Sequence, residues 1–261
     1  MAATGGHCSA RQTVECIGLN RQEKTAGVWP AETNEECPQR THSAGRCRGE
    51  YMKQALVLDF GNVISEPQDT SCYDRMGEMS GLGADFFRNA FWKYRPQFDR
   101  GDIRGIPMYQ AVLADGGMIP DTRDEAGCAR RDALAERLLA EDLESWFHIS
   151  RSVTDWALGV QKAGFTLGIL SNMPHDFLER YADRIELFKK ADVPVFSCLE
   201  REIKPEPAIY RILIARLGIP AHDIVFFDDL EANVLAARRE GMQAFLWTDL
   251  AQAQKDWTSA E

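Results

Sequence analysis

From residue 55 onward, the chain alternates short apolar runs with longer stretches of helical periodicity. The apolar runs are nearly continuous, which is typical of strands covered on both faces of a sheet. The pattern therefore predicts five buried strands, at 55–59, 165–170, 193–197, 224–227 and 244–247.

Between these strands, four stretches have the periodicity of helices, at 154–163, 176–183, 207–217 and 231–240. Pro207 suits the first turn of its helix, whereas Gly164, Gly218 and Gly241 follow last turns as C-cap glycines do. Strand–helix alternation of this kind predicts an α/β fold with a Rossmann-like, doubly wound parallel sheet.

Residues 66–150 are the exception, because they contain helical patterns but no strand-like run. An all-helical insert directly after the first strand is expected to form a cap domain over the active site. The Rossmann-like catalytic core would then consist of residues 52–65 and 151–261.

The cap segment FWKYRPQFDRGD combines aromatic and charged side chains. Three aromatic residues are expected to form the apolar core of the cap: Phe91, Trp92 and Phe98. Four others are candidates for substrate contact: Tyr94, Arg95, Asp99 and Arg100. A further aromatic group, Trp146, Phe147 and Trp156, is expected to pack at the hinge between the cap and the sheet.

Residues 1–51 differ from the rest, with few large apolar side chains and no clear period. Such a segment cannot bury enough surface to offset its ordering entropy. Two interpretations stay open, a disordered extension or a misassigned start with Met52 as the true initiator. Four of the seven cysteines lie here, but no Cys-x-x-Cys pair occurs, so reduced, incidental thiols are expected rather than a zinc site.

The net charge is −10, and the chain has no long basic run. Binding to nucleic acid or to an anionic membrane is therefore not expected. No apolar stretch is long enough to span a membrane, and the first residues lack the apolar segment of a secretory signal, so the cytoplasm is the expected compartment. Nothing in the pattern indicates an oligomeric state.

Polar residues follow four of the predicted strands, and ligands of parallel sheets bind at the carboxyl ends of strands. The residues expected on this single rim are Asp59, Gly61 and Asn62, then Ser171 and Asn172, then Lys204, and finally Asp228 and Asp229. Asn233, one helical turn further on, is expected to support Lys204 or the adjoining turn.

This set of side chains suits metal-assisted phosphoryl transfer to Asp59, because a carboxylate can attack phosphorus to give an aspartyl-phosphate. Mg²⁺ prefers oxygen ligands and bridges carboxylates to phosphate oxygens, which fits Asp228 and Asp229. Ser171, Asn172 and nearby backbone N–H groups would bind phosphate oxygens. Lys204 would add a cation for the charge of the transition state.

The segments LVLDFGNVI, LGILSN, IKPEPAIY and VFFDDLEANV resemble, in order, the four motifs of the haloacid dehalogenase-like (HAD) hydrolases. The resemblance covers roughly residues 53–250 and includes members with a helical cap after the first motif. It implies that Asp59 is nucleophile and metal ligand, and that Ser171 binds phosphate. It further implies that Lys204 stabilises charge and that Asp228 and Asp229 anchor Mg²⁺.

The chain departs from the family pattern at Gly61, where the usual Asp-x-Asp motif has an acid that protonates the leaving group. The family uses the backbone oxygen of this position for Mg²⁺, so Gly61 still counts as a metal ligand. A branch with D-x-G-N-V motifs, which includes small sugar-phosphate phosphatases, has the same glycine. The expected side chain for acid–base catalysis is nevertheless missing.

Three functions follow from these observations. The first is a Mg²⁺-dependent phosphomonoesterase for a small phosphorylated metabolite, including sugar phosphates among the candidates. The second is a 2-haloacid dehalogenase-type hydrolase that uses Asp59 on carbon, which Gly61 and the paired acids at 228–229 disfavour. The third is a binding or regulatory protein that has kept the fold without turnover.

Overall fold

The computed structural model describes residues 54–119, 121 and 123–260. The predictions for residues 1–51, including the four cysteines there, lie outside the described residues.

A five-stranded sheet with the order β3-β2-β1-β4-β5 forms the centre of the core, and every pair in it is parallel. Its strands are β1 (Ala55–Leu58), β2 (Thr166–Ser171), β3 (Val193–Phe196), β4 (Ile224–Asp228) and β5 (Gln243–Leu246). All five predicted strands are confirmed, each boundary to within one residue. The prediction succeeds because both faces of the sheet are buried, which makes the strand sequences continuously apolar.

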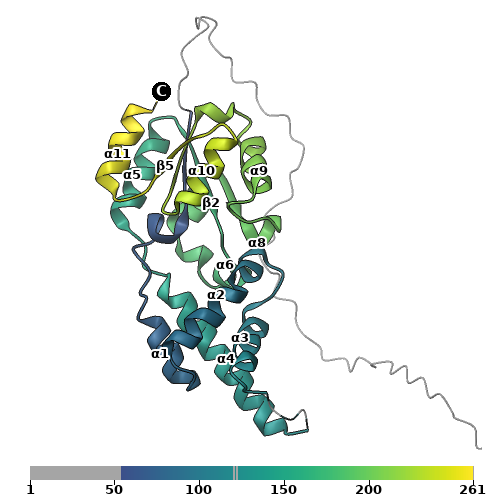
Figure 1. Ribbon diagram of the computed structural model, residues 1–261. Coiled ribbons are helices and arrows are strands. Elements are labelled where there is room, and N and C mark those ends of the chain that lie inside the picture. Colours follow the sequence, from purple (N-terminus) through teal and green to yellow (C-terminus); the bar gives the residue numbers. More distant parts are fainter. Residues whose placement is uncertain (1–53, 120, 122, 261) are drawn as a thin grey trace, which may run out of the picture. The chain divides into compact units, whose positions relative to one another are not determined.

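Helices cover the two faces of this sheet, as Figure 1 shows, and the fold is therefore a Rossmann-like α/β sandwich. Leu56 and Leu58 of β1 face a cluster with α5 and α11, whereas Ala55 and Val57 face α9 and α10. The helices of the core are α5 (Arg151–Lys162), α6 (His175–Tyr181), α7 (Glu186–Lys190), α8 (Ser197–Glu200), α9 (Pro207–Leu217), α10 (Glu231–Arg239) and α11 (Leu250–Ser259). Two short 3₁₀ turns complete it, η2 (Ala182–Arg184) and η3 (Ala221–Asp223).

The segment between β1 and β2 contains four further helices, α1 (Cys72–Ser80), α2 (Ala84–Arg100), α3 (Gly105–Asp115) and α4 (Glu125–Ser145). They enclose a hydrophobic cluster of their own, distinct from the two clusters on the sheet. The fold thus contains the expected all-helical cap, whereas its exact boundaries stay a prediction. Among the described residues, no helix combines the length and the apolar character needed to cross a membrane.

Inside this helical cluster, the prediction for Trp92 was wrong. Phe91 and Phe98 are fully buried, as expected, but Trp92 is 51% exposed. Neighbouring helical residues point in directions about 100° apart, so Trp92 lies outside the buried stripe that contains Phe87, Phe91 and Phe98.

The first strand lies in the middle of the sheet and determines where the site forms. The chain places β2 and β3 on one side of β1, then crosses to place β4 and β5 on the other. The strand order therefore reverses between β1 and β4, and ligands of such sheets bind beyond the carboxyl ends of strands at this point. After Asp59, the turn η1 (Phe60–Ile64) follows β1 there.

Candidate active site

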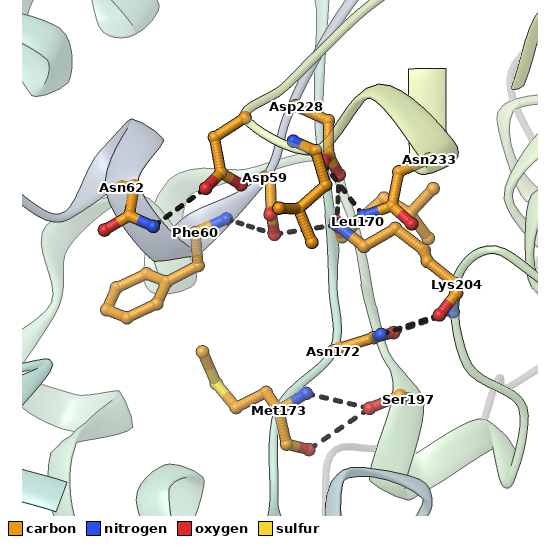
Figure 2. A network of polar contacts seen from close by, with 12 residues as sticks. Asp59, Phe60, Asn62, Leu170, Asn172, Met173, Ser197, Lys204, Asp228 and Asn233 are labelled. Carbon is orange, nitrogen blue, oxygen red and sulfur yellow. Dashed lines mark hydrogen bonds and ion pairs between the residues drawn. The ribbon is translucent and has the colours of Figure 1, made fainter. Parts of the chain in front are cut away.

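A cavity of about 350 Å³ opens beyond the carboxyl ends of β1, β2 and β4. Seven of the eight residues expected on the rim line it: Asp59, Gly61, Asn62, Ser171, Asn172, Lys204 and Asp229. The eighth, Asp228, is fully buried and contacts the lining residue Lys204. The structure thus brings the predicted set together, and Figure 2 shows the polar contacts around Asp59, Lys204 and Asp228.

Lys204 is the centre of these contacts, and its side chain is almost completely buried. Its Nζ lies 2.8 Å from Asp59 Oδ1, and it donates hydrogen bonds to Asp228 Oδ2 at 2.6 Å and to the Leu170 carbonyl at 2.9 Å. Burial alone would lower the pKa of Lys204, but the carboxylates of Asp228 and Asp59 outweigh burial and raise it. The lysine is therefore a fixed ammonium ion.

Asp59 lies directly after β1, as the N-cap of η1, and is 7% exposed. Its Oδ1 accepts a hydrogen bond from the Phe60 N–H at 2.6 Å, so the carboxylate is held at the start of the η1 turn. Burial raises the pKa of Asp59 to about 7, although Lys204 acts against this rise. The neighbouring charges of Asp228 and Asp229 contribute to this rise in pKa.

Asp228 is held from the side opposite Lys204 by two donors. Its Oδ1 accepts hydrogen bonds from the Leu230 N–H and from Asn233 Nδ2, each at 2.9 Å. Asn233 therefore supports the turn after β4 through Asp228, which is one of its two expected roles, because α10 begins close enough to β4 for the amide to reach back. Every oxygen of Asp228 consequently has a donor.

Asn172 holds the main chain of Lys204 in place. Its Oδ1 accepts from the Lys204 N–H at 2.8 Å, and its Nδ2 donates to the Lys204 carbonyl at 2.9 Å. This pair of bonds positions the lysine, so a contact between the Asn172 side chain and phosphate stays a prediction. Ser171 is 2% exposed and lines the cavity beside it, where its hydroxyl can reach a ligand.

Asn62 is a site residue to which the sequence analysis gave no role. Its Nδ2 donates to Asp229 Oδ2 at 2.8 Å, and its Oδ1 accepts from the Gln68 N–H at 3.0 Å. It also has a φ of 56°, in the left-handed region that asparagine tolerates better than most residues. The Gly61-Asn62 pair after the first predicted strand was the sequence signal that could have indicated this left-handed conformation.

At Gly61, the space next to the backbone, where the usual family motif has an acidic side chain, is filled by an aromatic ring. A Cβ added to Gly61 would lie 3.1 Å from the Trp146 ring, which packs against the turn. Trp146 was expected to be packed at the hinge, and it does contact the core cluster, but it also lines the cavity. The cap therefore fills, with an aromatic ring, the space into which a side chain at position 61 would project.

Two of the four cap candidates lie at the cavity and two do not. Arg95 and Asp99 line it, and their side chains form a buried pair with Nε and Oδ1 2.7 Å apart. Tyr94 instead donates its hydroxyl to Asp115, and Arg100 pairs with Glu206. Trp92, Asp142 and Trp146, which the sequence did not indicate as cavity residues, also line this side of the cavity.

The carboxylates of the site are arranged as a cation would require. Asp59, Asp228 and Asp229 each offer an oxygen, and these oxygens lie within 4.8 Å of one another. Burial raises the pKa of Asp229, while Asn62 acts against the rise and Asp228 adds to it. Three carboxylates thus share one ammonium ion, and a divalent cation with oxygen ligands fits the remaining negative charge.

Comparison with known proteins gives relatives that include phosphatases and bifunctional epoxide hydrolases. The family model for haloacid dehalogenase-like hydrolases matches residues 109–241. A phosphorylated carbohydrates phosphatase from Thermotoga maritima is 32% identical over 195 residues, which cover 73% of this chain and 82% of that protein. Rat bifunctional epoxide hydrolase 2 is 32% identical over 216 residues, which cover 78% of this chain.

The chain spans only 38% of the length of that epoxide hydrolase. Among solved structures, a HAD family enzyme from Bacteroides thetaiotaomicron, crystallised as a magnesium complex, superposes with a TM-score of 0.62 at 17% identity. That match covers 79% of this chain and 100% of the other, and it confirms the fold. The chain belongs to the haloacid dehalogenase-like hydrolases, a family of enzymes.

Proposed function

We propose that the protein is a Mg²⁺-dependent phosphomonoesterase that acts on a small phosphorylated metabolite. The observation that supports this most is the arrangement around Asp59. A buried carboxylate at the rim of the cavity lies 2.8 Å from a fixed ammonium ion and within reach of two further carboxylates. Such a site suits a divalent cation bound by the carboxylates and an anionic substrate bound next to that cation.

In the first step, an oxygen of the Asp59 carboxylate attacks phosphorus, and the bond from phosphorus to the substrate alcohol breaks. The products of this step are an aspartyl-phosphate and the alcohol. Gly61 has no side chain, so the departing oxygen takes its proton from another group in the cavity. Lys204 and the Ser171 hydroxyl would hold the phosphoryl oxygens while charge spreads over them.

In the second step, water attacks the phosphorus of the aspartyl-phosphate, which releases inorganic phosphate and restores the Asp59 carboxylate. Asp59, Asp228 and Asp229, with the carbonyl of Gly61, would hold Mg²⁺, which supplies positive charge next to the phosphate. Asn62 and Asn233 keep two of these carboxylates oriented through the bonds described above. Asn172 keeps Lys204 at its place in both steps.

Two similar proteins also support the proposal of a Mg²⁺-dependent phosphatase. The Thermotoga protein is a phosphatase by name, and the Bacteroides enzyme was crystallised with magnesium. The cavity is at the small end of the range for ligand pockets, which favours a small metabolite.

The test is the substitution Asp59→Asn, assayed by phosphate release from p-nitrophenyl phosphate with Mg²⁺. Loss of the nucleophile should lower kcat by at least about a thousandfold. The matched control is Asp155→Asn, an exposed aspartate of α5 that pairs with Arg151. Activity retained in Asp59→Asn, or wild-type activity that survives complete chelation by EDTA, would contradict the proposal.

A further inference from the structure

The proposed reaction needs a group that protonates the departing alcohol, and Gly61 cannot supply it. In an in-line displacement, the departing oxygen lies opposite the attacking one. Because the nucleophile Asp59 lies directly after β1, the departing oxygen points away from the sheet. It therefore points towards the cap wall, the side of the cavity formed by Trp92, Arg95, Asp99, Asp142 and Trp146.

Few of the described residues that line the cavity can give up a proton and regain it. Lys204 stays charged, because two carboxylates and a carbonyl surround its ammonium group. Arginine does not lose its proton in proteins, which excludes Arg95. Both side-chain oxygens of Asp142 are buried and the side chain is 1% exposed, so a departing alcohol does not reach them.

Asp99 is the acid that remains on this wall, since Asp59 and Asp229 are assigned to the nucleophile and the cation. It lies in the last turn of α2, and its side chain is 11% exposed. Its Oδ1 accepts a hydrogen bond from Arg95 Nε at 2.7 Å, whereas its Oδ2 accepts none from the described residues. Oδ2 does not belong to the fully buried unpaired atoms, so it is accessible from the cavity that Asp99 lines.

The main chain of Asp99 is fixed to the core beside the site. Ser197 Oγ donates to the Asp99 carbonyl and accepts from the Met173 N–H at 2.8 Å, a contact that Figure 2 shows. Met173 directly follows Asn172, whose side chain holds the main chain of Lys204. The end of α2 therefore lies close to the lysine, whose charge acts on the Asp99 carboxyl group.

The surroundings of Asp99 favour a carboxyl group that holds a proton. Burial raises the pKa of Asp99, and Arg95 and Lys204 act against the rise. Arg95 Nη1 also lies 3.7 Å from Asp142 Oδ1, so two buried carboxyl groups share one guanidinium. The remaining neighbour is the thiol of Cys198 in α8, which stays neutral because burial and then the charge of Asp99 raise its pKa to about 12.

We propose that Asp99 is the general acid and the general base of this reaction, in place of the side chain that position 61 lacks. The proposal rests on the proposed phosphatase function, because it takes Asp59 as the nucleophile. In the first step, Asp99 gives the proton on Oδ2 to the alcohol oxygen as the bond from that oxygen to phosphorus breaks, and Asp99 becomes a carboxylate.

In the second step, the Asp99 carboxylate takes a proton from the water that attacks phosphorus. The bond between phosphorus and the Asp59 oxygen breaks, inorganic phosphate leaves, and Asp99 is again a protonated acid. The two steps thus return both side chains to their starting states without a further reactant.

The test is Asp99→Asn in the full-length protein with Mg²⁺, which keeps an oxygen for Arg95 but has no acidic proton. Benzyl phosphate needs a protonated leaving group, because an alkoxide leaves poorly, whereas p-nitrophenolate leaves readily as an anion. The value of kcat/KM should therefore fall by at least about a hundredfold for benzyl phosphate and by less than about threefold for p-nitrophenyl phosphate. A structural role would lower both values alike, so equal losses would overturn the inference.

The second step gives an independent readout with p-nitrophenyl phosphate. Because the attacking water has lost its base, Asp99→Asn should release about one p-nitrophenolate per active site in a burst. Turnover should then be at least about a hundredfold slower than in wild type. A steady rate equal to that of wild type, without a burst, would overturn the inference.

Two further variants complete the test. Asp99→Ser, whose side chain is too short to reach the leaving group, gives the same two readouts if Asp99→Asn does not fold. Asp115→Asn is the matched control, because Asp115 is an exposed aspartate of the cap helix α3 that pairs with Lys93. It should change neither the difference between the esters nor the burst.

These measurements separate the inference from the phosphatase proposal. A wild type that releases phosphate from neither ester would overturn both. If the wild type is active and Asp59→Asn is not, equal losses for the two esters in Asp99→Asn would overturn the role of Asp99 alone.

Discussion

At position 61 the chain has glycine where the usual family motif has an acid. The backbone conformation there does not require glycine, whereas the neighbouring side chain leaves little room for a larger residue. Its φ of −63° and ψ of 129° are accessible to any residue. The obstacle to a side chain is the Trp146 ring, 3.1 Å from an added Cβ. Position 61 thus lacks an acidic side chain where the Trp146 ring of the cap lies close to the backbone.

The substitution Gly61→Asp should therefore not improve the enzyme. The new side chain crowds the Trp146 ring, which must shift, so we expect a loss of about 1–3 kcal/mol in the free energy of unfolding. We also expect kcat/KM to fall by about tenfold or more, because the cap wall moves. Urea unfolding and phosphate release measure the two effects. The double variant Gly61→Asp/Trp146→Ala should recover part of the stability, and a Gly61→Asp enzyme more active than wild type would contradict the argument.

The pKa of Asp59 gives a prediction for the effect of pH on metal binding. Burial raises this pKa from 3.8 to about 7, so in metal-free protein the bound proton stabilises the fold fully below about pH 3.8. This contribution is lost as the pH rises through about 7. Mg²⁺ needs the ionised carboxylate and competes with the proton.

The increase in Tm caused by Mg²⁺ should accordingly be larger at about pH 8 than at about pH 5.5. Differential scanning fluorimetry with Mg²⁺ and with EDTA measures it. Asp155→Asn should behave as wild type does. An equal or larger increase at the acidic pH would show that Asp59 is not a ligand.

At the scale of elements, the strand ends deliver the charged groups, and the turns after them hold these groups in place. The loop after β2 does this through Asn172, which makes two hydrogen bonds to the Lys204 main chain. Asn172→Ala should lower the free energy of unfolding by about 1–3 kcal/mol and lower kcat, since Lys204 loses its support. Asn172→Asp, which keeps the acceptor for the Lys204 N–H, should lose less. Equal stability of wild type and Asn172→Ala in urea unfolding would refute this role.

The elements also show how far the sequence could predict this structure. The strands β1 to β5 were predictable because each is a local apolar run, and helix α9 was predicted with its observed bounds, Pro207–Leu217. The site residues at the strand ends were predictable because ligands of parallel sheets bind at the carboxyl ends of the strands.

What could not be predicted depends on contacts between distant parts of the chain. The contact of Trp146 with Gly61 and the bond from Asn62 to Asp229 join residues far apart in sequence. No local period encodes such pairs. Asp142 lies on a mostly polar helix, where nothing but its neighbours in space distinguishes it from a solvated acid.

At the scale of the whole described chain, the cap helices have a hydrophobic cluster of their own, and α4 also joins the sheet cluster through Leu143, whereas α2 reaches the core through polar contacts. Ser197 Oγ donates to the Asp99 carbonyl at 2.5 Å, and Arg201 pairs with Asp102. Exposed ion pairs contribute little to stability. The cap helices α2 and α3 are therefore expected to open locally more easily than the sheet.

Hydrogen exchange should show this difference directly. Amides of α2 and α3 should exchange through openings of lower free energy than those of β1 and β4. Phe91→Ala, which removes a fully buried ring of the cap cluster, should lower protection in α2 and α3 by about 3–5 kcal/mol while leaving β1 and β4 nearly unchanged. A uniform loss of protection across both regions would mean that cap and sheet unfold as one unit.

The packing of Trp146 on Gly61 also has an evolutionary consequence. Either position can change by mutation, but a side chain at position 61 requires the ring at position 146 to shift by a few tenths of an ångström, so we expect changes at the two positions to occur together. Homologous sequences should therefore divide into two groups, one with an acid after the nucleophile and a small cap residue, the other with glycine and a large ring. An alignment rich in sequences that combine an acid with a tryptophan would show that the two positions vary independently.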